Sequence, residues 1–113
     1  MMTPKMPSSE LYAWLRLSLE PNLHANTARL LLANFGLPPS IYEQSISTLS
    51  RYTDTSLATQ MRSAPPETLE QHLQYSLQWA QVPDQHILCL ADPHYPQALL
   101  QLPDPPLVLY AKG

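Results

Sequence analysis

Glycine is scarce in this sequence, with two residues among 113, whereas proline occurs thirteen times. Phosphate-binding loops need several glycines close together, and the chain has no such cluster. Proline fixes φ and removes a backbone donor, so frequent prolines predict short elements separated by rigid turns. The composition therefore excludes long strands and coiled coils.

Cysteine and long apolar runs are also lacking. The single cysteine, Cys89, lies in the apolar run 87–91, which excludes an internal disulfide and a multi-cysteine zinc site. No run of about 18 apolar residues occurs, and the first residues do not join a basic region to a hydrophobic stretch. We therefore expect a cytoplasmic protein with neither a membrane span nor a signal peptide, and no membrane partner.

Charge is sparse and its balance is negative. Charged residues make up 13% of the chain, and six basic residues against nine acidic ones give a net charge of −3. Strong nucleic-acid binding relies on positive charge along the phosphate backbone, so this chain alone is not expected to bind it strongly. Hydrophobic residues reach 44%, which predicts a folded domain rather than disorder.

The first part of the chain predicts a largely buried helix. Leu11, Trp14 and Leu15 fall on one helical face. Ser8 and Ser9 precede that face and are candidate N-caps. A helix is therefore expected from about residue 8 to residue 20.

Further helices are predicted up to residue 82. The apolar residues of segment 28–35 recur at i, i+3, i+4 and i+7, between a candidate N-cap at Asn26 and a left-handed stop at Gly36. Segment 39–62 divides into short helical pieces with Ser, Thr or Asp at their starts. After Pro65-Pro66, leucines three to four residues apart predict a longer helix. The expected fold class is mainly α.

The pattern changes in the last third of the chain. Residues 87–91 and 107–111 are apolar runs typical of strands, and residues 95–102 predict a short helix between them. Two strands alone are marginally stable in water, so this segment is interpreted as the opening of a truncated α/β domain. We expect a helical domain over residues 8–82 and an incomplete second domain over residues 83–113.

One set of residues in this segment stands in a specific order: a Tyr-Pro pair, a leucine three residues later, an Asp-Pro-Pro turn, and an apolar strand ending in lysine and glycine. They are Tyr95, Pro96, Leu99, Asp104, Pro105, Pro106, Leu109, Tyr110, Lys112 and Gly113. In this order they resemble the opening motif of the DNA-processing protein A family, also called DprA or Smf. The leucine-rich segment 11–36 is similar to that family's N-terminal helical domain, described as SAM-like.

The resemblance implies a small SAM-like bundle of short helices followed by the start of a Rossmann-like domain. It implies a non-enzymatic recombination mediator that binds incoming single-stranded DNA during natural transformation in competent bacteria and helps load RecA. The basic groove and glycine-rich turns of that domain are missing from this chain, so its main DNA-binding activity is expected to be missing too. Single-stranded DNA and RecA are then partners of the parent protein. A regulatory protein on the helical domain and a homodimer stay open.

A second interpretation is a freestanding helical adaptor that binds another protein and has no nucleic-acid role. The two interpretations differ in one observation, which is whether the reading frame continues past Gly113 into a Rossmann-like sequence. Neither interpretation includes an enzyme, because no catalytic motif occurs in the chain. No cofactor is predicted.

Two arginines and one loop are the candidate DNA contacts. Arg16 and Arg29 lie on the first two helices, where each is either a weak contact to a DNA backbone or a solvated or paired surface group. The loop 21–26 stands where a helix-hairpin-helix would hold a phosphate on a Gly-X-Gly turn. Asn22 and His24 occupy the two glycine positions, and a histidine side chain would obstruct the phosphate, which favours a structural role.

Two further groups of residues are candidate sites. Tyr75 and Trp79 lie four residues apart on the long helix, away from its leucine stripe, and either seat the C-terminal strands or form a partner surface. The need to cover apolar strands favours the first role. His86, Asp92 and His94 carry ligand-type side chains, but their spacing matches no metal motif, so no metal site is predicted.

Overall fold

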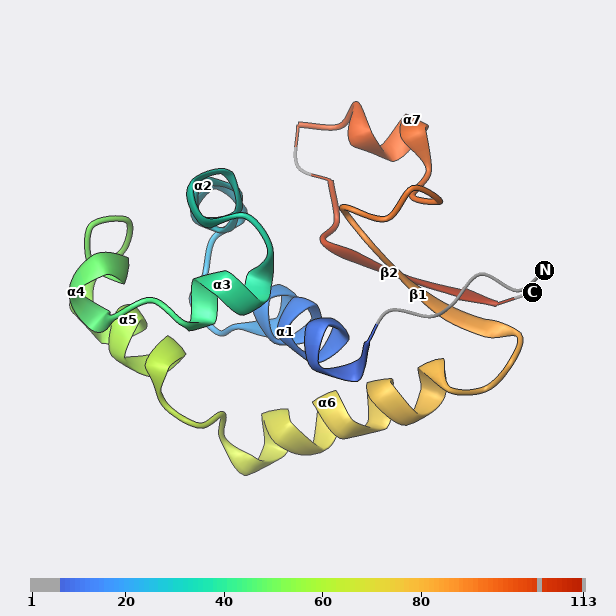
Figure 1. The fold of residues 1–113 in the computed structure, drawn as a ribbon, viewed down its shortest axis with the longest axis horizontal. Helices are drawn as coiled ribbons and strands as arrows, with labels where there is room; N and C mark the ends of the chain where they lie inside the picture. Colours follow the sequence, from blue (N-terminus) through green and yellow to red (C-terminus); the bar gives the residue numbers. More distant parts are fainter. Residues whose placement is uncertain (1–6, 104, 113) are drawn as a thin grey trace.

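A computed structural model describes residues 7–103 and 105–112 (Figure 1). Asp104 and Gly113, two residues of the motif above, lie outside this part of the chain. The described residues are mainly helical, as predicted, and no helix among them combines the length and apolar composition needed to cross a bilayer. In chain order the elements are α1 (Ser8–Leu19), α2 (Ala25–Phe35), α3 (Pro38–Tyr42), α4 (Ile46–Leu49), α5 (Thr55–Arg62), α6 (Glu67–Ala80), β1 (Gln85–Cys89), α7 (Gln97–Leu100) and β2 (Val108–Lys112).

Helix α1 is the element around which the others pack, and Figure 1 shows it between α3, α6 and the two strands. Its Trp14 and Leu15 join a buried cluster that includes Leu73 of α6 and Ile87 of β1. Its Leu17 belongs to a second buried cluster, because it points to another face of the same helix. The second cluster joins α1 to α2, α3, α4 and α5 through Leu31, Ile41, Leu49, Leu57, Ala58 and Met61. The first cluster spans both of the expected domains.

The short helices α4 and α5 begin at polar caps of the predicted residue types, whereas α3 begins at Pro38 without a side-chain cap. The Ser45 side chain accepts a hydrogen bond from the Thr48 amide at 3.1 Å, and the Asp54 side chain accepts one from the Leu57 amide at 2.7 Å. Each bond satisfies a backbone donor that the first helical turn leaves unpaired. Each cap marks the start of its helix, and both helices are too short to be stable alone.

The predicted N-caps of the first two helices are wrong. Helix α1 begins at Ser8 and α2 begins at Ala25, and neither has a side-chain cap hydrogen bond. Asn26 lies inside the first turn of α2, where its side-chain oxygen accepts a hydrogen bond from Arg29. The side chain that was expected to cap the helix instead orients an arginine on it.

Strands β1 and β2 pair antiparallel, with Ile87 opposite Tyr110 and Leu88 opposite Leu109. Ile87 faces the helices and is buried in the first cluster. Leu88 and Leu109 point to the opposite face, are half-buried and belong to neither cluster. The antiparallel pairing distinguishes this segment from a parallel strand-helix-strand unit, whose two strands run in the same direction.

Candidate functional site

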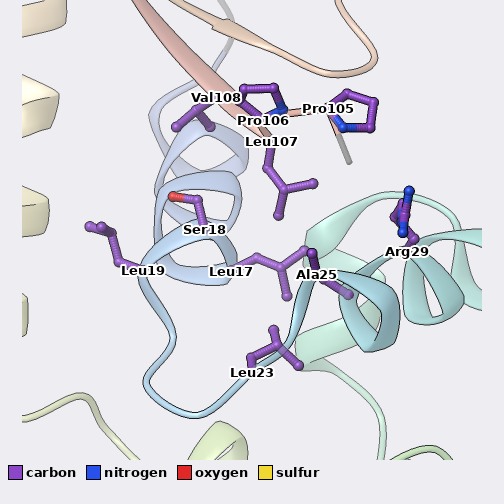
Figure 2. Close-up of a pocket in the computed structure, with 11 residues that line it drawn as sticks. Leu17, Ser18, Leu19, Leu23, Ala25, Arg29, Pro105, Pro106, Leu107 and Val108 are labelled. Atoms are coloured by element: carbon purple, nitrogen blue, oxygen red, sulfur yellow. The ribbon is translucent and has the colours of Figure 1, made fainter. Parts of the chain in front are cut away.

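A groove of about 470 Å³ lies where α1 ends, α2 begins and the segment 105–108 crosses both (Figure 2). Figure 2 shows Leu107 pointing from this segment toward Leu17 and Ala25. Leu107 packs against both buried clusters, so it links the helical part of the core to the strands. Most of the lining side chains are apolar.

Tyr95 fixes the course of the segment above the groove. Its side chain is 3% exposed, and its hydroxyl donates to the backbone carbonyl of Pro106 at 2.7 Å. The Leu90 amide donates to the Leu107 carbonyl at 2.9 Å, just beyond the end of β1. Two residues of the motif, Tyr95 and Pro106, are therefore fastened to each other across eleven positions of the chain.

The other described motif residues have structural positions. Pro96 precedes the first turn of α7, and Leu99 lies half-buried within that helix. Pro105 and Pro106 line or border the groove, and Lys112 is exposed at the end of β2. These positions give the motif the geometry of a fixed turn beside the groove.

Arg29 is the one charged residue among the described residues that line the groove. Its guanidinium donates to the backbone carbonyl of Pro103 and to the side chain of Asn26. The first bond ties α2 to the chain just before the groove-crossing segment. Both acceptors are uncharged, so neither of them neutralises the positive charge of Arg29 at the rim of the apolar groove.

Arg16, the other candidate DNA contact, is engaged inside the fold. Its side chain is 11% exposed, with 3.6 Å between its Nε and Oε2 of Glu20. Its Nη2 donates to the backbone carbonyls of Gln60 at 3.2 Å and of Ser63 at 2.6 Å. Its Cζ lies 4.7 Å from the centroid of the Tyr42 ring. Arg16 is therefore a paired group rather than an exposed contact to a DNA backbone.

The loop between α1 and α2 contains a left-handed residue at one of the two glycine positions. Asn22 has φ 67°, and it is the one non-glycine residue with a positive φ in the described chain. Asparagine tolerates this conformation better than most residues. His24 has an extended backbone and an exposed side chain just before α2. The loop makes its tight turn without the pair of glycines that a close backbone approach to phosphate would favour.

Trp79 contacts the sheet, whereas Tyr75 does not become buried. The rings of Trp79 and Tyr110 meet edge to face, with centroids 5.3 Å apart. The hydroxyls of Tyr110 and Ser76 lie 2.9 Å apart. Tyr75 is 70% exposed. Trp79 therefore packs against the C-terminal strands, as expected, whereas Tyr75 lies on the outer surface.

The remaining candidate residues with ligand-type or nucleophilic side chains are His86, Asp92, His94 and Cys89. The Asp92 carboxylate accepts a hydrogen bond from the His94 amide at 2.8 Å, which closes a turn, and His86 is exposed on β1. In the described chain no three His, Cys, Asp or Glu side chains lie close enough to hold a metal ion. Burial raises the pKa of the Cys89 thiol to about 12, so it stays protonated at neutral pH and is a poor nucleophile.

Two features were missed in the sequence. The Arg16–Glu20 pair has a local signal, because the two residues stand at i and i+4, where opposite charges meet on a helix. The Tyr95–Pro106 hydrogen bond has no such signal, because it joins a side chain to a backbone carbonyl eleven residues away.

Comparisons of the chain with protein-family models, with curated proteins and with solved structures found no match.

Proposed function

We propose that this chain is the N-terminal accessory part of a bacterial recombination mediator of the DprA or Smf type. In this proposal the helices α1–α6 form the SAM-like bundle, and the segment from β1 to β2 opens a Rossmann-like domain. The parent protein binds incoming single-stranded DNA in natural transformation and helps load RecA. The observation that supports this proposal best is the hydrogen bond between Tyr95 and Pro106, because it gives two residues of the motif a shared structural role.

The sheet also supports the proposal. Leu88 and Leu109 form a cross-strand apolar pair on the face turned away from the described helices. A face of this kind is normally covered by further chain or by a partner. Antiparallel strands commonly lie at the edge of an otherwise parallel sheet. We place β1 and β2 at such an edge of the Rossmann-like domain.

The charges of the chain support an accessory role rather than direct DNA binding. Arg16 is buried beside Glu20, and Arg29 is bonded to the Pro103 carbonyl. Arg62 donates to the Tyr42 carbonyl. These three guanidiniums hold the fold together, and the net charge is −3. These three arginines are therefore not available as a continuous basic path for a phosphate backbone.

The second candidate is a helical adaptor for another protein, without a nucleic-acid role. It is favoured by exposed apolar side chains near the end of α6 and on β2. Tyr75 is 70% exposed, Tyr110 is 49% exposed and Val82 is 42% exposed. Aromatic residues on a surface are typical of protein interfaces.

Titration with a fluorescent single-stranded oligonucleotide tests the proposal. We expect residues 1–113 to bind more weakly than about micromolar at physiological salt, because non-specific electrostatic binding gives roughly 10⁻⁴–10⁻⁶ M and this chain is acidic. A longer product of the same reading frame should bind more tightly and load RecA. Micromolar or tighter binding by residues 1–113 would overturn the accessory role. A reading frame without a Rossmann-like continuation would favour the adaptor.

A further inference from the structure

Two oppositely charged side chains are buried together between α1 and α5. The Glu20 side chain is 1% exposed and that of Arg16 is 11% exposed. Burial of a charge costs free energy unless the charge is paired and hydrogen-bonded. The two partners differ in how well this condition is met.

Arg16 has partners that do not depend on Glu20. Its Nη2 donates to the Gln60 and Ser63 carbonyls, at and just beyond the last turn of α5, where the helix dipole is negative. Its Cζ lies 4.7 Å from the centroid of the Tyr42 ring, within the range of a cation–π contact. The guanidinium charge would therefore remain stabilised if the carboxylate beside it became neutral.

Glu20 has fewer hydrogen-bond partners than Arg16, although Arg16 Nε is also buried without one among the described residues. Its Oε2 lies 3.6 Å from Arg16 Nε, and its Oε1 accepts no hydrogen bond from the described residues. Burial raises the pKa of Glu20, and this effect exceeds the opposing effects of the Arg16 charge and the Gln60 side chain. The carboxylate is thus the member of the pair that gains most from neutralisation.

The neighbouring titratable groups do not change charge in the same pH range. Burial, with a hydrogen bond to Glu70, raises the pKa of Tyr12 to about 12, and burial raises the pKa of Tyr42 further. The hydrogen bond from Tyr12 lowers the pKa of Glu70, so Glu70 gains its proton only below its ordinary range. Among the described residues, Arg16, Tyr12 and Tyr42 interact electrostatically with Glu20; Glu70 accepts a hydrogen bond from Tyr12, and Arg62 donates to the backbone carbonyl of Tyr42.

We infer that Glu20 acts as a proton-sensitive lock: its protonation stabilises the junction between α1 and α5. Proton uptake removes a poorly solvated charge and leaves Arg16 bonded to α5, and Gln60 Nε2 continues to hold the Pro21 carbonyl at 2.8 Å. The folded chain then holds this proton more tightly than the unfolded chain does. By linkage, the contribution of Glu20 favours folding as the pH falls toward the ordinary range of a glutamate, and weakens as the pH rises.

Urea unfolding of the full chain at about pH 5 and about pH 7.5 tests the lock. For the wild type we expect the unfolding equilibrium constant to be several-fold larger at the higher pH. The Glu20→Gln variant should lose most of this difference, whereas Glu43→Gln, at an exposed glutamate just after α3, should retain it. The four histidines are present in all three proteins, so their contributions cancel in the comparison.

A second measurement keeps the test decisive if Glu20→Gln does not fold. NMR titration of the Glu20 side-chain carboxyl in the wild-type chain should place its pKa above the ordinary range of a glutamate. A Glu20 pKa within or below that range would overturn the lock. So would a folded Glu20→Gln variant with the pH dependence of the wild type.

Discussion

Replacement of Trp14 by alanine is expected to destabilise the fold by about 3–5 kcal/mol. Trp14 is 1% exposed and lies in the cluster that joins α1 to α6 and β1. Its removal would leave a cavity at the point where the helices meet the sheet. Since domains are commonly stable by only about 5–15 kcal/mol, the loss should shift the urea midpoint of the circular dichroism signal strongly.

Tyr75→Ala is the matched control for this variant. It also removes an aromatic ring, but Tyr75 is 70% exposed on α6. Its effect should stay within about 0.5 kcal/mol, as for most surface substitutions. Similar midpoints for the two variants would show that Trp14 does not hold the helices and strands together.

Leu31→Ala is expected to cost about 2–5 kcal/mol, because Leu31 is fully buried in the cluster that joins α2 to α3, α4 and α5. The neighbouring Leu30 is 52% exposed on the same helix, so Leu30→Ala makes the same chemical change without opening a core cavity. We expect it to cost less than about 1 kcal/mol. Equal urea midpoints for the two alanine variants would show that α2 is peripheral to the fold.

The helices could largely be predicted because their signals are local. The repeat of apolar residues in α2 and the Pro-Pro pair before α6 each act within a few turns. The two apolar runs predicted as strands correspond to β1 and β2, shifted by one or two residues. Helix starts were less accurate, because α1 and α2 begin without any side-chain cap that the sequence could reveal.

The candidate site could not be predicted to the same extent because its contacts are between distant parts of the chain. Arg16 bonds to carbonyls 44 and 47 residues away, and Arg29 bonds to one 74 residues away. Both arginines were expected on helices, and both are there. Their bonding partners depend on how α5 and the segment before β2 fold back over α1 and α2, which no local pattern encodes.

Amide hydrogen exchange tests most directly whether the strands and helices of this chain form one folded unit. We predict slow exchange in β1 and β2, at the Leu90 amide bonded to Leu107, and in α1 and α6, because the strands share a buried cluster with both helices. In the turn between the strands, the Tyr95 amide should also exchange slowly, because it donates to the Asp92 carbonyl at 3.0 Å and its residue is buried. Exchange at random-coil rates in both strands, with α1 and α6 still protected, would contradict this and show that the strands need further chain or a partner to fold.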